Sequence, residues 1–452
     1  MKTLAVALLV LGLLMPLTAS GQNKLFPYKY SSDDLPNGLR VITIPTDYPN
    51  IVALYIVVNT GSRNEIEPGK SGFAHLFEHL MFRGTEKVSA DKYNEALKNA
   101  GADSNASTWD DRTVYQAVFS KEDLDQIMML EADRFQNLKV PIELFKTETR
   151  AVLGEYNKNA SSPVRALYEK LRDKAFESHT YQHTTMGYLR DVENMPNQYD
   201  YSIEFFKRYY RPEYTTIVVV GDVKQDNVMS LVKKYWSDWK RGSYVPQIPK
   251  EPEQNEERTA EVDWPQQTLP WIAIAYKVPA FAEDQKDKPA LDLIGSLGFS
   301  QNSELYQRLV IKEQKVDALG ADTEDHSDPY LMTVLVRVKD PKDVGYVKGE
   351  IIKTFDSFKT GLVSKDKLDA VKSNLKYSFA LSLDNSQAIA ESVAPFVALR
   401  RTPEALNKVF DTYASITPED IQAMAKKYFV EKHRTIVTLS HKEKSTNAAQ
   451  KK

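Results

Sequence analysis

Residues 71–82 of the chain read SGFAHLFEHLMF, and this stretch decides more about the fold than any other. At about 100° of rotation per residue, its apolar side chains share one face of a helix: Phe73, Leu76, Phe77, Leu80 and Met81. His75, Glu78 and His79 fall on the opposite face. The pattern therefore predicts a helix that buries an apolar stripe and presents two imidazoles, one turn apart, beside a carboxylate.

This arrangement of side chains is typical of a metal site. His75 and His79 are four positions apart on the predicted helix, which places their Cβ atoms about 5–6 Å from each other, close enough to share one ion. Zinc fits best, because neutral imidazole is a preferred ligand and the chain has no cysteine to supply a thiolate. Glu78 could take a proton from a water molecule that the metal acidifies. The chain has only seven histidines, so a chance match is rare, and a surface histidine pair beside a glutamate is the weaker interpretation.

A catalytic zinc ion normally takes three protein ligands, so a third is needed. Residues 145–157 have the apolar pattern of a helix and carry Glu148 and Glu155, which lie two turns apart on one face. Periodicity does not choose between them, and two solvated surface glutamates remain the alternative. His179 and His183 lie in a predicted loop and are not expected to form a second site.

The composition excludes several classes of protein. The 452 residues carry 59 basic and 62 acidic side chains, a net charge of -3, which disfavours a nucleic-acid partner. The absence of cysteine excludes disulfides, thiol nucleophiles and iron–sulfur clusters. Apolar residues at 42% and charged residues at 27% are typical of a soluble globular protein with about two to four domains.

The first 22 residues resemble a secretory signal peptide. Lys2 precedes an apolar run over residues 4–15, which Pro16 and the small residues 18–21 follow. The run is too short for a bilayer-spanning helix, which needs about 20 apolar residues, although an uncleaved anchor is the alternative. We therefore expect export to the periplasm or the exterior and no membrane span after cleavage.

The remainder of the chain reads as a duplication of α+β type. The segments that begin at Lys207 and Lys426 each combine an amphipathic helix, a short turn and a β-branched strand, and they are offset by 426 − 207 = 219 residues. A proline-rich linker separates the two copies. The predicted organisation is a signal peptide (1–22), an N-terminal zinc-binding domain (23–242), a linker (243–261), an inactive homologous domain (262–441) and a flexible tail (442–452).

These features together resemble the pitrilysin/insulinase zinc metallopeptidases, the inverzincins, and in particular a half-size bacterial subunit similar to a processing peptidase. The resemblance rests on the histidine motif, the NAST stretch at 105–108, the YYRP stretch at 209–212 and the duplication. It implies two homologous α/β-roll domains, each an antiparallel-rich sheet packed with helices. It also implies that Glu155, 155 − 75 = 80 residues beyond His75, is the third ligand, and that Glu148 orients a histidine from outside the metal shell.

The resemblance further implies how a peptide binds. Asn105, Ala106 and Ser107 match a strand that accepts substrate by β-augmentation, although from the residues alone an ordinary hairpin is as good an interpretation. The family's second domain supplies an arginine and, seven residues later, a tyrosine. Arg308 matches the arginine, but Lys315 stands in place of the tyrosine. A companion family subunit, or a second copy of the chain, is therefore expected to complete the substrate site.

The predicted function is that of an exported zinc endopeptidase acting on peptides or unfolded segments. Two alternatives remain open: a non-catalytic or partner-dependent scaffold subunit, and a zinc hydrolase acting on a non-peptide bond. The duplication offset carries His75 to Ile294 and His79 to Gly298, so the second domain lacks metal ligands. One zinc ion per chain is therefore expected.

Overall fold

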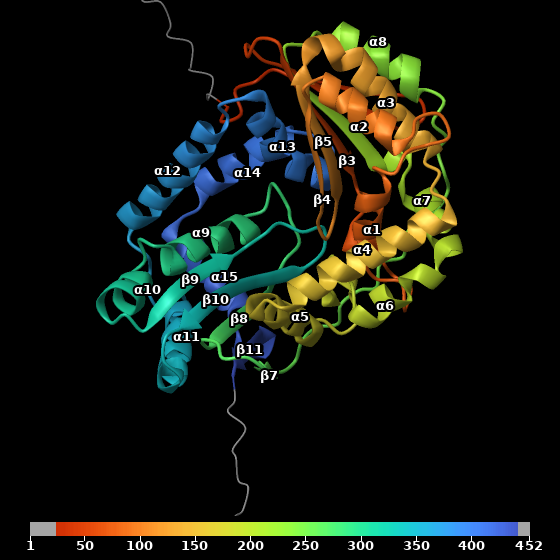
Figure 1. Ribbon diagram of the computed structural model, residues 1–452. Helices are drawn as coiled ribbons and strands as arrows, with labels where there is room; N and C mark the ends of the chain where they lie inside the picture. Colours follow the sequence, from red (N-terminus) through yellow and green to blue (C-terminus); the bar gives the residue numbers. More distant parts are fainter. Residues whose placement is uncertain (1–23, 442–452) are drawn as a thin grey trace, which may run out of the picture.

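The computed structural model describes residues 24–441, so the predicted signal peptide and tail lie outside the described residues. Two mixed β-sheets, each packed with helices, make up the fold (Figure 1). This architecture confirms the predicted α+β class. The helix predicted within residues 71–82 is confirmed, because α1 covers Phe73–Leu80. The β-branched run at residues 51–58 forms β3, Ile51–Val58.

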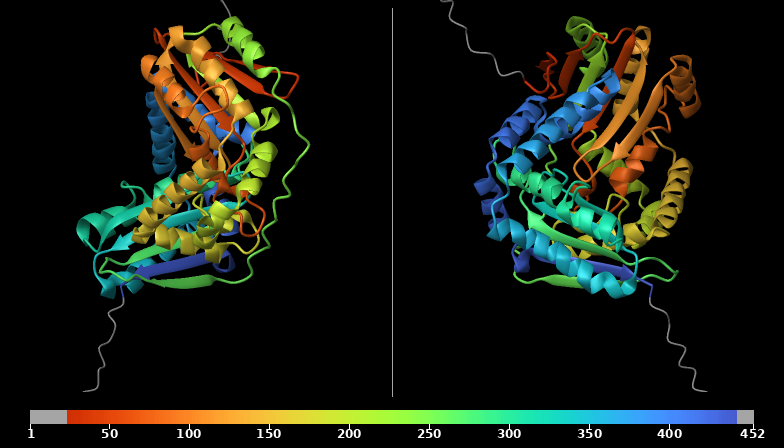
Figure 2. Two further views of the ribbon diagram at one scale, coloured as in Figure 1. Left: turned by 45° about the vertical axis from the view of Figure 1, so that its right-hand side comes forward. Right: turned by 90° about the vertical axis from the view of Figure 1, so that its left-hand side faces the viewer.

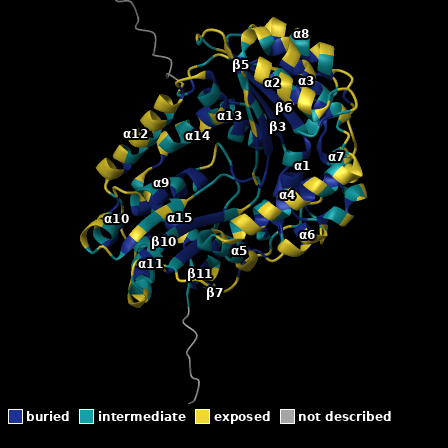
Figure 3. Ribbon diagram, viewed as in Figure 1, coloured by how far each residue is buried: buried dark blue, intermediate teal, exposed yellow. Residues whose placement is uncertain are grey.

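The first sheet has six strands, of which only β2 and β6 run parallel to each other. In spatial order they are β1 (Ser31–Asp34), β2 (Arg40–Pro45), β6 (Thr215–Gly221), β3 (Ile51–Val58), β5 (Thr113–Ser120) and β4 (Asp103–Thr108). The central strands β3 and β6 consist mostly of β-branched and other apolar residues and are buried on both faces (Figure 3). Strand β4 forms one edge of this sheet.

The second sheet has five strands in the same order as the first sheet, but it has no strand equivalent to β1. Only β7 and β11 run parallel to each other in this sheet. Its strands are β7 (Arg258–Asp263), β11 (Arg434–Ser440), β8 (Trp271–Val278), β10 (Tyr330–Val338) and β9 (Val316–Asp322). Strands β6 and β11 begin at Thr215 and Arg434, a separation of 434 − 215 = 219 residues. The repeat seen in the sequence is therefore a structural duplication.

Fifteen α-helices lie around the sheets within the described residues. Those of the first half are α1 (Phe73–Leu80), α2 (Ala90–Asn99), α3 (Leu124–Asn137), α4 (Ile142–Ala160), α5 (Pro163–Ala175), α6 (Leu189–Asn194), α7 (Tyr199–Tyr209) and α8 (Gln225–Trp236). Those of the second half are α9 (Asp287–Phe299), α10 (Glu304–Tyr306), α11 (Val344–Thr360), α12 (Lys365–Ser382), α13 (Ser386–Arg400), α14 (Glu404–Ser415) and α15 (Pro418–Tyr428). Over the part of the chain that the structure describes, none of these helices has the length and apolar character needed to cross a membrane.

The two halves exchange helices across their interface. Helix α13 of the second half lies on β3 and β6 of the first sheet, where Val393 and Val397 join an apolar cluster with Tyr55. Helix α5 of the first half lies on the second sheet, where Leu167 and Leu171 pack in the same way (Figure 1). A sheet with apolar side chains on both faces must be shielded from water on both faces. Helix α13 shields one face of the first sheet, and α5 shields one face of the second sheet.

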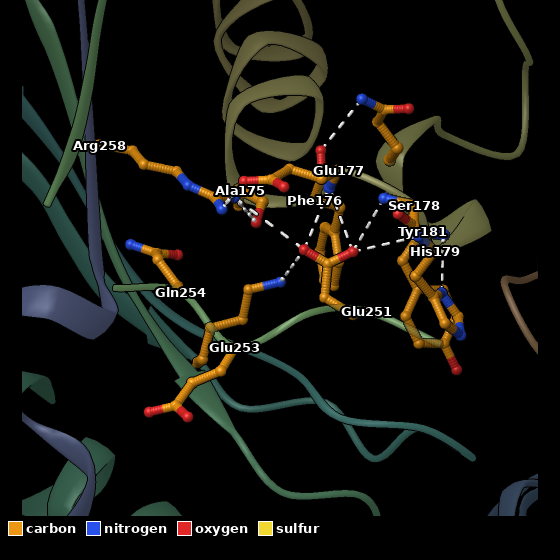
Figure 4. A network of polar contacts seen from close by, with 12 residues as sticks. Ala175, Phe176, Glu177, Ser178, His179, Tyr181, Glu251, Glu253, Gln254 and Arg258 are labelled. Atoms are coloured by element: carbon orange, nitrogen blue, oxygen red, sulfur yellow. Dashed lines mark hydrogen bonds and ion pairs between the residues drawn. The ribbon is translucent and has the colours of Figure 1, made fainter. Parts of the chain in front are cut away.

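The segment between α8 and β7 contains no helix or strand and runs along one side of the molecule (Figure 2). It is anchored through Glu251, whose carboxylate accepts backbone N–H bonds from Glu177, Ser178 and His179 and pairs with Lys277 at 3.3 Å (Figure 4). The predicted linker extends to residue 261, whereas β7 begins at Arg258. The last four residues of that range belong to the second sheet, because they pair with β11.

Candidate metal site

Helix α1 begins at a tightly held turn. Gly72 has a φ of 90°, which glycine adopts without steric cost, and its N–H donates to Glu65 at 2.7 Å. The N–H of Ala74 donates to the other oxygen of the Glu65 carboxylate, also at 2.7 Å. Glu65 therefore binds two N–H groups that the first turn of a helix leaves unpaired, where the helix dipole favours a negative charge. No periodicity or spacing in the sequence marks this role of Glu65.

The apolar face of α1 is buried as predicted. On its opposite face, His75 and His79 meet Glu155 of α4, which gives three possible metal ligands. One ligand atom from each of His75, His79 and Glu155 lies within 4.8 Å of the others. Oε2 of Glu155, on α4, is 3.6 Å from Nε2 of His75 and 3.5 Å from Nε2 of His79. Within residues 24–441 this is the one group of three such side chains able to hold a metal ion.

The geometry of this cluster fits zinc. Bonds of about 2.1 Å in a tetrahedral arrangement place neighbouring ligand atoms about 3.4 Å apart, close to the two distances from Glu155. Two imidazoles and a carboxylate also form a donor set that zinc enzymes use. Burial, helped by repulsion from His79 and opposed by Glu155, lowers the pKa of His75 to about 4. His75 is therefore neutral near pH 7, which is the form that binds metals.

Glu148 lies beside the cluster but outside it. Its Oε2 is 3.8 Å from Nδ1 of His79, and its carboxylate is bound by Arg83, with Nε of Arg83 2.8 Å from Oε1 and Nη2 3.0 Å from Oε2. The side chain of Glu148 is buried, whereas that of Glu155 is 41% exposed at the open side of the cluster. The structure thus separates two glutamates that helical periodicity leaves equivalent. It also adds Arg83, for which the sequence offers no signal.

Replacing Glu148 with Gln is expected to weaken zinc binding about 10–100-fold, because groups that orient a ligand contribute about that much. The change removes the charge that faces His79 and holds Arg83. Zinc affinity measured by competition with a chromophoric chelator checks this. Glu143→Gln, an exposed glutamate at the start of α4, is the matched control. Equal zinc affinity in the two variants would contradict the role of Glu148.

Glu78 lies on α1 next to the cluster and is not one of the three converging ligands. Oγ1 of Thr108, at the end of β4, donates a hydrogen bond of 2.6 Å to Oε2 of Glu78. Burial raises the pKa of Glu78, while the Thr108 hydrogen bond and the nearby His79 act in the opposite direction. Glu78 is therefore a carboxylate held beside the cluster by a hydrogen bond, and a carboxylate is a type of group that can act as a general base. Thr108 belongs to the NAST stretch, but its contact with Glu78 is visible only in three dimensions.

Replacing Thr108 with Val is expected to lower kcat about tenfold with zinc content unchanged. Valine keeps the shape of threonine but removes the hydrogen bond that orients Glu78, and a bond to a charged group contributes about 1.5–3 kcal/mol. Steady-state kinetics beside zinc analysis checks this. Thr360→Val at the end of α11 is the control for the same change at a remote hydroxyl. An unchanged kcat in the Thr108 variant would show that Glu78 is oriented by other groups.

Strand β4 places Asn105, Ala106 and Ser107 at the sheet edge beside α1. Ala106 is buried, Ser107 is half-buried and Asn105 is exposed. Among the described strands, β4 pairs with β5 alone, so its other edge has no strand partner. Tyr115, which pairs with Ala106 from β5, is buried behind α1, where its hydroxyl donates to the Phe77 carbonyl oxygen.

The structure does not bring Arg308 to the cluster. Arg308 lies in the π-helical segment Gln307–Lys312, next to α10 and far from α1 (Figure 1). Its guanidinium binds Glu350 and donates to the hydroxyl of Tyr346 at 2.8 Å. Lys315, in the position where the family has tyrosine, pairs with Asp343. A tyrosine hydroxyl does therefore accompany Arg308, but it comes from α11.

The second half has no metal ligands at the equivalent positions. Ile294 and Gly298 lie on α9, and Lys367 and Asn374 lie on α12, where Glu148 and Glu155 would map. Apart from Ile294, these residues line an open cavity of about 960 Å³. His179 and His183 lie in a loop, as predicted, on either side of the short turn Thr180–Gln182. Nε2 of His179 is 3.0 Å from a carboxylate oxygen of Asp328, and His183 is buried near Glu65.

Comparisons with known proteins agree with this fold and site. Residues 40–188 match the model of insulinase (peptidase family M16), and residues 198–375 match the peptidase M16 inactive domain. The zinc protease PqqE of Helicobacter pylori is 30% identical over 94% of this chain and 96% of that protein. The crystal structure of a protease from Helicobacter pylori superposes with a TM-score of 0.86 at 29% identity, over 91% of this chain and 99% of that one. The probable mitochondrial-processing peptidase subunit beta of Arabidopsis thaliana is 25% identical over 92% of this chain and 79% of that protein.

The fold and the site thus define a two-domain chain of the zinc-protease type. The chain belongs to peptidase family M16, the insulinase family. Relatives at this level of similarity are named zinc proteases or processing-peptidase subunits. The resemblance inferred from the sequence is therefore confirmed.

Proposed function

We propose that the chain is an exported zinc-dependent endopeptidase that hydrolyses peptide bonds in peptides or unfolded segments. The observation that carries this proposal is the convergence of His75, His79 and Glu155, with Glu78 held beside them by Thr108. All four polar side chains of the site are in place, which a scaffold subunit without turnover does not require. The open edge of β4 next to α1 favours a peptide over a substrate with a non-peptide bond.

In this mechanism His75, His79 and Glu155 would hold the metal ion. Zinc at that position supplies Lewis acidity toward the scissile carbonyl group and toward a water molecule. Glu78 accepts a proton from the attacking water as the carbon–oxygen bond forms. It then donates that proton to the amine nitrogen as the carbon–nitrogen bond breaks. The main chain of β4 holds the peptide extended, so binding depends little on its sequence.

The proposal includes a second subunit, either a companion family member or another copy of the chain. The segment Gln307–Lys312, which carries Arg308, follows α10 and lies apart from α1 (Figure 1). A neighbouring subunit could therefore supply such an arginine–tyrosine pair to a substrate bound at His75. A relative named as a subunit supports a heterodimer. Export to the periplasm is proposed from the pattern of residues 1–22 alone.

The test is to incubate the zinc-loaded mature protein, alone and mixed with candidate companion subunits, with a library of quenched fluorescent peptides. We expect cleavage that a chelator stops and that added zinc restores. A requirement for the companion would identify a partner-dependent enzyme. Absence of cleavage by the zinc-loaded protein under every condition would favour the scaffold role.

A further inference from the structure

Trp109, the residue after the substrate strand, has an unusual environment. Its side chain follows Thr108, which holds Glu78, and 42% of the residue's surface is exposed. The other four tryptophans are less exposed: Trp236, Trp239 and Trp264 are buried and Trp271 is half-buried. Large apolar surface therefore faces solvent at the end of β4, one residue beyond the threonine that holds Glu78.

The exposed ring is nevertheless fixed. Its Nε1–H donates to Oγ of Ser107 at 3.2 Å, and the Arg112 guanidinium lies over the ring at 4.7 Å from its centroid. The backbone N–H of Trp109 donates to the carbonyl oxygen of Arg112 at 2.8 Å, which continues the β4–β5 pairing by one residue. Arg112 is itself 7% exposed, so it cannot move aside freely. Holding an exposed ring in one orientation costs side-chain entropy in the free protein, and that ordering favours a ligand that contacts it.

The alternation of β4 places this ring on a defined face. Ala106 packs into the core around α1 and Thr108 reaches Glu78, so both point to the α1 face. Ser107 and Trp109 share the other face, as their hydrogen bond confirms. A peptide paired with the open edge of β4 alternates in the same way, and side chains on one face of adjacent strands lie about 4.5–5.5 Å apart. Peptide side chains on the second face would therefore meet Trp109 while their neighbours face the cluster.

The available surface selects one chemical class. The polar N–H of the ring is used by Ser107, so the ring offers only apolar surface to a ligand. A lysine or arginine could stack on a tryptophan, but the Arg112 guanidinium already occupies the ring and would repel a second cation. An acidic side chain would gain little from Arg112, because the negative charges of Asp110, Asp111, Glu324 and Asp325 already act on that guanidinium. A large uncharged side chain meets none of these penalties.

We propose that Trp109, backed by Arg112, is a specificity subsite that selects a large apolar or aromatic side chain within two residues of the cleaved bond. The inference rests on the proposed peptidase function. Main-chain pairing with β4 alone would bind peptides almost independently of their sequence. The Trp109 subsite would add a preference for peptides with a large apolar side chain.

The test compares kcat/KM for peptide pairs that differ only as Phe against Ala at each of the two positions on either side of the cleaved bond. We expect the unmodified protein to prefer Phe about 10–100-fold at one of these positions. That ratio should fall to about threefold or less in Trp109→Ala and largely return in Trp109→Phe. Thermal melting of both variants shows whether they fold. Cleavage without this preference, or a preference that survives Trp109→Ala, would overturn the inference.

A binding measurement separates this inference from the proposed function. In the Glu78→Gln background, a Phe-containing peptide should change the intrinsic fluorescence, because Trp109 is the exposed tryptophan beside the strand. The change should disappear when Trp109→Phe is added. It should persist with Trp271→Phe, the matched control, whose ring also carries a guanidinium, that of Arg337 at 5.2 Å. If no form of the protein cleaves any peptide, the peptidase proposal fails. The fluorescence change still tests the subsite in that case, and its absence would overturn the proposed role of Trp109.

Discussion

Glu78→Gln is expected to abolish peptide hydrolysis while zinc remains bound. The amide keeps the size of the carboxylate but cannot accept a proton from water, and general-base catalysis contributes about 10²–10⁴-fold to a rate. Glu78 is not one of the three converging ligands, so the metal affinity should stay close to that of the unmodified protein. We therefore expect kcat to fall about 10³-fold or more with one zinc ion per chain.

Parallel kinetics and elemental analysis of the same sample check this result. Glu86→Gln, an exposed glutamate paired with Lys139, controls for the loss of one carboxylate from the first half. Two outcomes would contradict the assignment. Activity close to normal would mean that another group takes the proton, and lost zinc would mean that Glu78 belongs to the metal shell.

Glu155→Gln is expected to remove zinc from the protein. A neutral amide oxygen is a much weaker ligand than a carboxylate, and the two remaining ligands come from one helix. Because loss of an orienting group outside the shell already costs about 10–100-fold, loss of a direct ligand should exceed about 100-fold in affinity. Activity should fall with occupancy and recover in part at high zinc concentration.

Zinc stoichiometry after gel filtration, together with affinity by chelator competition, measures the effect. The expected order of zinc affinity is the unmodified protein and Glu143→Gln first, then Glu148→Gln, then Glu155→Gln. Circular dichroism shows whether α4 remains folded in each variant. Full occupancy in Glu155→Gln, or weaker binding in Glu148→Gln than in Glu155→Gln, would exchange the roles of the two glutamates.

Local patterns predicted those features that depend on one element. The spacing of His75 and His79 is set by helix geometry, so their shared face and the buried apolar stripe could be predicted before the fold was known. The long β-branched run of β3 and the 219-residue repeat are also properties of the chain itself. For the same reason, the absence of ligands from the second half followed directly from the residues at the equivalent positions.

Contacts between elements could not be predicted in this way. The choice between Glu148 and Glu155 depends on how α4 is rotated against α1, and periodicity within α4 is identical for both. Counting seven residues from Arg308 leads to Lys315, where the family has a tyrosine. In the folded chain, the tyrosine hydroxyl that contacts Arg308 belongs to Tyr346 of α11. Glu65, Arg83 and Thr108 each act on a residue of another segment, and none has a pattern of its own.

Residue patterns alone were sufficient to predict the helix that carries His75 and His79, the likeness to a protease family and the duplicated α+β architecture. Each of these follows from the spacing of residues within one element, from residue type, or from a segment that repeats along the chain. All three can be seen without knowing how the elements pack. Glu155 was expected from the family resemblance, and its position against His75 and His79 in three dimensions agrees with that expectation. The hydroxyl that orients Glu78, and the way in which α5 and α13 cross between the halves, became visible only in the folded chain. These depend on how helices and sheets pack against one another. That packing is set by the combined burial of side chains distant in the sequence, and no single segment contains it.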